Sequence, residues 1–322
     1  MNRTTVAIIG AGAVGLYLAW RLALKGNIVV VYEKRKTIKA KACSGLVSDA
    51  FLERIPGLVE LAENKINTCF IHFPQKTIRL HFSSPHFVIC RQKINEYLFE
   101  LALSAGVSFV FSHPFKRIAN DINRFGRVVG CDGAHSAVRK WLRLPDPSMR
   151  LGIQALTEEK DYSSRVDVWP VGSGFFWRIP RGECVEYGIL GDRFSANKDF
   201  SKYIKELGVK NLYSIHTASI PCGIVLPVHN KITLCGDAAG LTKPWSGGGL
   251  LWGIVAGDIL VETFPDFTAY TKKVSRIFVP QIFWGKKITQ VVYWLGHKAP
   301  FLLANKFVER INYNNDFLPF IF

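Results

Sequence analysis

The sequence predicts an α/β protein that combines a parallel sheet, an inserted and mainly antiparallel second sheet, and a C-terminal helical segment. Three observations lead to this prediction. Between Val6 and Glu33 a buried strand, a glycine-rich turn, a helix and a second strand follow one another. Residues 66–90 and 151–227 show the two-residue period and the turn signals of strands. In residues 266–322 apolar side chains recur at helical spacing.

The N-terminal element begins with the apolar run Val6–Ile9, which is typical of a fully buried strand. The sequence GAGAVG follows at residues 10–15 and leads into an amphipathic helix. A second apolar strand, Ile28–Tyr32, ends at Glu33. This order of strand, glycine-rich turn, helix, strand and acid is the Rossmann-type fingerprint of dinucleotide binding.

Each residue of the fingerprint has a physical role. Gly10 permits the tight turn, Gly12 lets a pyrophosphate approach the backbone, and Gly15 lets the helix pack closely on the strand. The free N–H groups at the start of the helix favour an anion. The Glu33 carboxylate lies where it can accept hydrogen bonds from a ribose.

Two later turns also place an acid directly after a buried strand. Asp132 follows the strand that ends near residue 131, and Asp237 follows the strand at residues 232–235. Ligands of parallel sheets bind beyond the carboxyl ends of the strands, so the three turns can meet one extended cofactor. The N–H groups near Gly248 and Gly249, before an apolar helix, offer a further anion site.

Composition bounds the class of protein. The chain has 322 residues, 48% of them hydrophobic, and a formal charge of +16, which indicates either an anionic partner or a generally basic surface. The seven cysteines are scattered, without a CxxC pair, and the histidines lack ligand spacing, so we expect no metal site and a reducing, cytoplasmic location. No alternation of basic and aromatic residues indicates nucleic-acid binding.

The set GAGAVG, Glu33, Arg91, CDG at 131–133 and GDAAG with the later GGG resembles FAD-dependent oxidoreductases of the hydroxybenzoate-hydroxylase type. Within them, ACSG at 42–45, GFFWRIP at 174–180 and GDAAGLTKPWSGGGL at 236–250 resemble the geranylgeranyl reductase family. The resemblance implies FAD as the cofactor. The residues expected to bind it are Gly10, Gly12, Ala13, Val14, Gly15, Glu33, Lys34, Cys43, Ser44, Gly45, Arg91, Asp132, Asp237, Gly248, Gly249 and Leu250.

The substrate motif departs from the family pattern PxxYxWxFP. Phe175 replaces the tyrosine and Ile179 the phenylalanine, whereas Trp177 and Pro180 are retained. An aspartate usual in the helix after Arg91 is Asn95 here. Two interpretations stand for the aromatic positions, which either line a lipid tunnel or form plain core. The residues expected to bind substrate are Phe175, Trp177, Pro180 and Trp245.

The implied reaction is saturation of C=C bonds in geranylgeranyl-type chains of membrane lipids or prenyl precursors. An isolated alkene accepts hydride only if a proton is also delivered, and water must be excluded. Cys43 is the candidate catalytic residue, as a proton donor or gate, and its alternative is an inert packing thiol. NAD(P)H and ferredoxin both remain open as electron donor, because no second GxGxxG occurs.

Two other functions stay open. One is an FAD-dependent monooxygenase of aromatic compounds or lipids with the same fold, and the other is a basic, non-catalytic flavoprotein that binds lipid or RNA.

The C-terminal segment is interpreted either as a packed helix pair or as a basic surface that contacts an anionic membrane peripherally. We expect three regions, listed with their functions: an FAD-binding domain (1–65, 91–150 and 228–265), a substrate-binding domain (66–90 and 151–227) and the helical segment 266–322.

Overall fold

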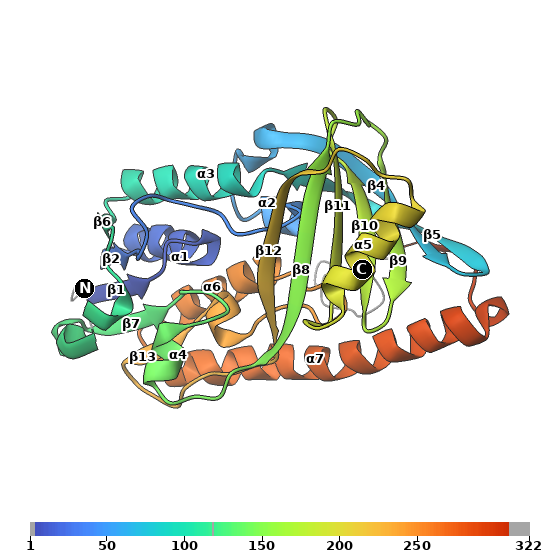
Figure 1. The fold of residues 1–322 in the computed structure, drawn as a ribbon. Coiled ribbons are helices and arrows are strands. Elements are labelled where there is room, and N and C mark those ends of the chain that lie inside the picture. The colour runs from blue at the N-terminus through green and yellow to red at the C-terminus, as the bar shows by residue number, and fades with distance from the viewer. Residues whose placement is uncertain (1–3, 118, 309–322) are drawn as a thin grey trace.

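The computed structural model describes residues 4–117 and 119–308 and contains a five-stranded parallel sheet (Figure 1). Its strand order is β13-β7-β1-β2-β6, and every neighbouring pair is parallel. The strands are β1 (Thr5–Ile9), β2 (Ile28–Tyr32), β6 (Ser108–Val110), β7 (Arg127–Gly130) and β13 (Ile232–Leu234). Helices cover this sheet, so β1 is buried from Val6 to Ile9.

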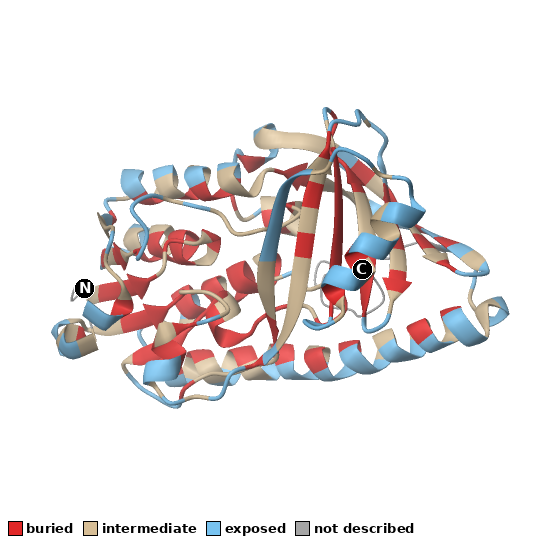
Figure 2. Cartoon of the chain, viewed as in Figure 1, coloured by how far each residue is buried: buried red, intermediate tan, exposed pale blue. Residues whose placement is uncertain are grey.

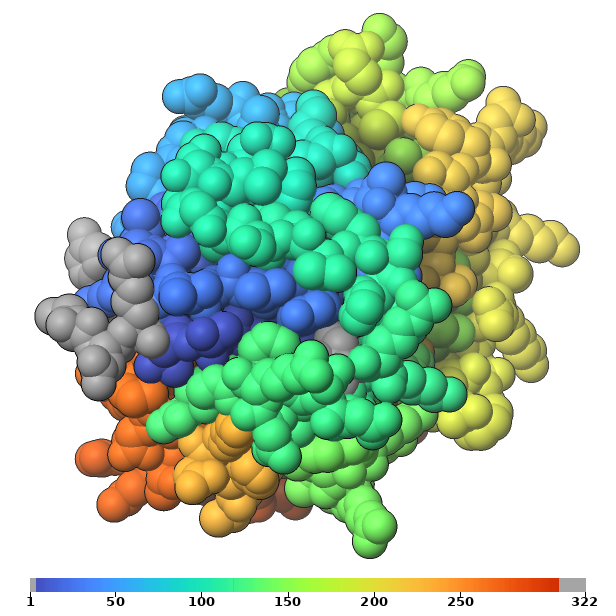
Figure 3. All heavy atoms as spheres, turned by 90° about the vertical axis from the view of Figure 1, so that its left-hand side faces the viewer, coloured from blue at the N-terminus to red at the C-terminus, as the bar shows by residue number. Residues whose placement is uncertain are grey.

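Three helices form the layers around the parallel sheet. They are α1 (Ala13–Leu24), α3 (Arg91–Ser104) and α6 (Leu250–Thr263), and α1 packs against both of the others. Viewed from this end of the molecule, the blue and teal N-terminal segments and the green segment around residues 112–145 share one surface (Figure 3). Segments far apart in sequence therefore build this one unit together.

The second sheet has nine strands and is mainly antiparallel, as the sequence predicts. Eight follow the order β12-β8-β11-β10-β9-β4-β5-β14, and β3 pairs with β5. Within the described residues of this second sheet, only β4–β9 and β5–β14 are parallel pairs. The strands are β3 (Leu46–Ser48), β4 (Ala62–Phe73), β5 (Lys76–Ile89), β8 (Ser148–Thr157), β9 (Arg165–Val171), β10 (Gly174–Pro180), β11 (Val185–Gly191), β12 (Tyr213–Cys222) and β14 (Lys306–Val308).

Helix α5 (Ala196–Glu206) crosses one face of this sheet (Figure 1). Phe176 of β10 stacks on Tyr203 of α5, with ring centroids 5.1 Å apart. Because strand side chains alternate, Phe175 and Trp177 point to the opposite face. The shorter elements are α2 (Asp49–Leu52), α4 (Ala137–Trp141) and the 3-10 turns η1 (Leu58–Leu61), η2 (Phe115–Arg117), η3 (Ala119–Arg124), η4 (Gly236–Ala239) and η5 (Pro300–Leu302).

The C-terminal segment is one long helix, α7 (Phe267–Lys298), rather than a helix pair. It runs along the base of both sheets (Figure 1). A Cβ on Gly285 would lie 2.5 Å from the Trp245 ring, and one on Gly296 would lie 2.1 Å from the Phe73 ring. Each glycine thus lets α7 pack closely on a different unit. After α7 the short strand β14 joins β5, and residues 309–322 of the predicted helical segment lie outside the described part of the chain.

Four strands, β3, β8, β12 and β14, are not foreseen individually by the sequence analysis. Strand β12 is an edge strand whose first five residues are all exposed, so it lacks the alternation of apolar and polar side chains that marks a half-buried strand. The expected domain boundaries remain a prediction.

Candidate functional site

The turns that follow β1, β7 and β13 lie side by side, because these three parallel strands are adjacent in the sheet. Gly10 has a φ of +106°, and a Cβ at this residue would lie 2.6 Å from the Cys131 carbonyl oxygen and 2.9 Å from Asp132 Cα. The first and second turns are therefore in direct contact. Gly236 of the third turn lies against Val14, so this turn borders the start of α1.

Two glycines of the first turn have opposite surroundings. A Cβ on Gly15 would lie 2.1 Å from the Gly10 carbonyl oxygen, so only glycine lets α1 pack here. A Cβ on Gly12 would meet no described atom within 4 Å. Gly12 thus borders open space at the N-terminus of α1, where N–H groups and the helix dipole favour phosphate.

The Glu33 carboxylate is buried beside the same turn. Its Oε2 accepts a 2.9 Å hydrogen bond from the Ala11 N–H, and its Oε1 accepts one of 2.9 Å from the Arg35 N–H. Each carboxylate oxygen can accept a second hydrogen bond, which leaves capacity for ribose hydroxyls. Lys34, beside it in sequence, is exposed.

Asp132 carries a buried acceptor atom that is not used within the described residues. Its Oδ2 accepts hydrogen bonds from the Ala137 N–H at 2.6 Å and the Val138 N–H at 3.3 Å, whereas Oδ1 has no hydrogen-bond partner there. Burial raises the pKa of this carboxyl. A buried acceptor beside Gly10 fits a hydroxyl-bearing ligand such as FAD.

Asp237 pairs with Lys41 of the segment between β2 and β3. A Cβ on Gly249 would lie 2.9 Å from Asp237 Oδ1, so the carboxylate lies against the turn that caps α6. Leu250 begins that helix, and Gly248 is exposed just before it. Lys41 is a residue that the sequence analysis did not single out, although it precedes ACSG directly.

A cavity of about 620 Å³ separates the Lys41 segment and the start of α3 from the large sheet. Cys43 and Arg91 face each other on its wall, with Arg91 Nη1 4.0 Å from Cys43 Sγ. Arg91 Nε also donates a 3.2 Å hydrogen bond to Oδ1 of the buried Asn95, which stands where the family has an aspartate. The sheet side of the cavity includes Gln154, Leu156, Glu186, Ser214 and His216.

A buried charge network connects the cavity wall to the ACSG segment. Arg181 donates from Nη1 to the Ser44 carbonyl oxygen at 2.7 Å and to Glu186 Oε2 at 2.8 Å, and from Nε to Glu63 Oε2 at 2.9 Å. Arg181, Glu63 and Glu186 all line the cavity. Burial raises the pKa of Glu186, and Arg181 opposes this shift.

Comparisons with known proteins agree with this geometry. The model of an NAD(P)-binding Rossmann-like domain matches residues 8–44. A digeranylgeranylglycerophospholipid reductase of Methanosphaera stadtmanae is 25% identical over 83% of this chain and 77% of that protein. The structure of a geranylgeranyl bacteriochlorophyll reductase-like protein from Thermoplasma acidophilum has a TM-score of 0.69 and 19% identity, and covers 94% of this chain and 89% of that one.

The chain resembles the geranylgeranyl reductase family. These comparisons confirm two predictions, that the chain is an FAD-dependent oxidoreductase and that it has the expected fold class. A flavin-dependent halogenase shares the fold as well, with a TM-score of 0.69 and 16% identity over 96% of this chain and 68% of that one. The fold alone therefore does not select the substrate.

The substrate motif of geranylgeranyl reductases lies beside the cavity in this chain and does not line it. Phe175 and Pro180 are buried within the large-sheet unit, and Trp177 reaches the wall only through its Nε1, which donates a 2.9 Å hydrogen bond to Glu186 Oε1. Trp245 is buried between Trp252 and α7. The four residues stay a prediction for substrate binding.

Arg181 and Glu186, like Lys41 and Glu63, line the cavity and were not singled out by the sequence analysis. Arg181 directly follows Pro180 of the motif, and Glu186 is the register partner of Ile179 across the β10–β11 hairpin. The sequence Pro180-Arg181-Gly182 is typical of a turn, and the β10–β11 hairpin places both residues at one end of the sheet.

Proposed function

We propose that this chain is an FAD-dependent reductase that saturates C=C bonds of geranylgeranyl-type chains in membrane lipids or prenyl precursors. The observation that carries the proposal is the shared cavity wall of Cys43 and Arg91, next to the edge where three nucleotide-type turns meet. Relatives named digeranylgeranylglycerophospholipid reductase support the choice of substrate.

FAD, when reduced, supplies hydride for such a reduction. The chain would hold it through the Gly12 region and Glu33 at the nucleotide end, and through Asp132 and Asp237 along the sheet edge. Cys43 is placed to hold or deliver a proton at its Sγ, because that atom faces the cavity beside the Arg91 guanidinium. Gln154 and His216 make the opposite wall of the cavity polar, so the apolar alkene would bind away from these two side chains.

The test is anaerobic incubation of the FAD-loaded protein with a chemical reductant and geranylgeranyl lipids, followed by mass spectrometry. The chemical reductant replaces the natural donor, which can be NAD(P)H or a ferredoxin. Gain of hydrogen pairs by the lipid supports the proposal. Unchanged alcohol, diphosphate and ether forms in the presence of reduced bound FAD would overturn it.

The same assay separates the other functions. A hydroxylated product with consumption of oxygen would indicate a monooxygenase. Binding of polyanions with a steep salt dependence, together with bound FAD that no donor reduces, would indicate a non-catalytic flavoprotein. Cys43→Ala should keep FAD binding while it lowers the rate of hydrogen-pair gain about a hundredfold, the usual contribution of one general acid. Equal rates of hydrogen-pair gain in wild type and Cys43→Ala would show that Cys43 is an inert packing residue.

We further propose that α7 contacts an anionic membrane surface, where such lipids reside. Within the described residues no helix is both long and apolar enough to span a bilayer. On α7, Trp284 and Trp294 are 59% and 60% exposed, and Phe283 and Val291 are exposed as well. The helix also carries six lysine or arginine residues and no acid. Exposed aromatics beside cations favour an interface with anionic lipid, whereas a second copy of this helix would be repelled.

A further inference from the structure

The segment around Cys43 is held at three described points. On its N-terminal side Lys41 pairs with Asp237. On its C-terminal side the Gly45 carbonyl oxygen accepts a 3.0 Å hydrogen bond from the Ile89 N–H. Between them, Arg181 reaches across from the large sheet and donates to the Ser44 carbonyl oxygen at 2.7 Å.

The Arg181 contact connects the two halves of the cavity. Ser44 belongs to the segment that leads out of the parallel sheet, whereas Arg181 directly follows β10 of the large sheet. The Ser44 carbonyl belongs to the residue after Cys43, so anchoring it restrains the backbone next to Cys43.

Two acids hold the Arg181 guanidinium in place. Glu63 comes from the start of β4 and Glu186 from β11, and both lie within 2.9 Å of guanidinium nitrogens. Arg181 is 9% exposed and Glu186 is 1% exposed, so these charge-assisted hydrogen bonds are shielded from water. A planar guanidinium can contact three partners in fixed directions, which a lysine ammonium on its flexible stem cannot reproduce.

We propose that Arg181, oriented by Glu63 and Glu186, is the positioning residue that fixes the Cys43–Gly45 segment against the cavity. The inference rests on the proposed function in one respect: it assumes that the segment oriented by Arg181 is the one that lies beside FAD. Arg181 itself acts through Ser44, and its contribution is geometric.

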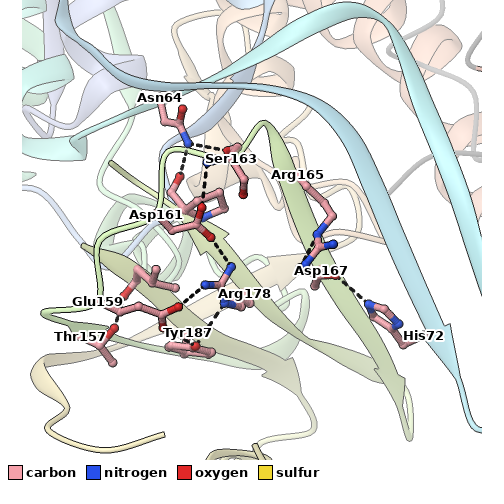
Figure 4. Close-up of polar contacts among 12 residues, drawn as sticks. Asn64, His72, Thr157, Glu159, Asp161, Ser163, Arg165, Asp167, Arg178 and Tyr187 are labelled. Atoms are coloured by element: carbon pink, nitrogen blue, oxygen red, sulfur yellow. Dashed lines mark hydrogen bonds and ion pairs between the residues drawn. The ribbon is translucent and has the colours of Figure 1, made fainter. Parts of the chain in front are cut away.

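The structure offers a matched control on the opposite face of the same strand. Arg178 of β10 is also held by acids, with Nη1 2.6 Å from Asp161 Oδ2 and a further ion pair to Glu159, and its Nε donates to the Tyr187 hydroxyl at 3.2 Å (Figure 4). Arg178 does not line the described cavity. Replacing each arginine by lysine therefore disturbs similar networks, of which only one contacts the Cys43 segment.

The experiment is alkylation of the cysteines in the full chain without added cofactor, resolved by peptide mass spectrometry. In Arg181→Lys the alkylation rate at Cys43 should rise about tenfold, because a buried charge-assisted hydrogen bond is lost. Cys90, on the same cavity wall but without contact to Arg181, should keep its rate, and the buried Cys235 should stay protected. Arg178→Lys should change none of the three.

Three outcomes are decisive. A selective increase at Cys43 supports the proposal. Equal increases at Cys43, Cys90 and Cys235 in Arg181→Lys would show general destabilisation and overturn it, as would an unchanged rate at Cys43. A second readout is the absorption spectrum of added FAD, which should shift in Arg181→Lys and not in Arg178→Lys. The alkylation needs neither FAD nor lipid, so its result is independent of whether the chain reduces alkenes.

Discussion

Gly12 and Gly15 lie in the same turn, yet substitution by alanine should affect them in opposite ways. At Gly12 a Cβ meets no described atom within 4 Å, whereas at Gly15 it would lie 2.1 Å from the Gly10 carbonyl oxygen. Gly12→Ala should therefore weaken FAD binding about tenfold or more and leave the midpoint of urea unfolding nearly unchanged. Gly15→Ala should lower that midpoint. Flavin titration and urea unfolding of both variants check this, and tight FAD binding by Gly12→Ala would contradict the placement of the pyrophosphate.

Glu186 should make the stability of the protein depend on pH. Burial raises its pKa in the folded state, so the folded protein binds more protons than the unfolded chain. The associated stability is fully present below the ordinary glutamate pKa and is lost as pH rises through the raised value. Wild type should thus lose stability relative to Glu186→Gln as pH rises. Unfolding free energies of both proteins across this range test the sign, and parallel curves would show that the attraction of Arg181 offsets the burial of Glu186, so that its pKa is the same in the folded and unfolded states.

Residues near the glycine-rich turns were predictable because local sequence determines their geometry. The turn after β1, Glu33 after β2 and the acids after β7 and β13 all lie at strand ends of one parallel sheet. The Arg181 network joins three segments, around Ser44, around Glu63 and in the β10–β11 hairpin, and no single segment shows that all of its groups meet. Pairing of Lys41 with Asp237 depends on the same kind of long-range contact.

At the scale of elements, α7 combines a buried face with an exposed face (Figure 2). The exposed face carries aromatic and basic side chains. Tyr270, Val274, Phe278 and Ile282 pack inward at helical spacing, which the sequence pattern indicated for this tail. The sequence could not show that a single helix of 32 residues forms, since Pro280 lies within it. Prolines usually end or kink a helix. Here the half before Pro280 is buried at Tyr270, Val274 and Phe278, and the half after it packs on Trp245 and Phe73.

The exposed face of α7 should bind vesicles that contain anionic lipid. Replacing both Lys286 and Lys287 by alanine should lower partitioning about tenfold or more, because each cation near such a surface contributes about 1 kcal/mol. Trp284→Ser with Trp294→Ser should lower it further by removing the aromatic contact. Cosedimentation with anionic and with neutral vesicles measures both effects.

Phe194→Ser is the control for this surface. Phe194 is 84% exposed in the turn before α5 and does not belong to α7, so its loss should leave partitioning unchanged if α7 forms the membrane contact. Equal binding of wild type to anionic and neutral vesicles would contradict the electrostatic part of the proposal, and no binding to either would remove it.

At the scale of the whole molecule, α7 joins the two sheets through close glycine contacts. Gly285 lies against Trp245 of the parallel-sheet unit, and Gly296 lies against Phe73 of the large sheet. Gly285→Ala should lower the free energy of unfolding by about 1 kcal/mol or more, because overpacking exceeds the gain in helix propensity. Gln290→Ala, on the exposed side of α7, should be neutral or slightly stabilising. Chemical unfolding of both variants provides the measurement, and a stabilised Gly285→Ala would show that Trp245 can move aside.

A helix that packs closely on both sheets also limits how these sheets can move relative to each other. The two sheets cannot rotate apart without pulling α7 off either Trp245 or Phe73, so a clamshell motion is blocked along that side. The isoprenoid substrate proposed above would then enter through the cavity beside the segment from Lys41 to Gly45, which a few polar contacts hold in place. If entry of the isoprenoid limits the rate, that rate would depend on how often those polar contacts break and re-form.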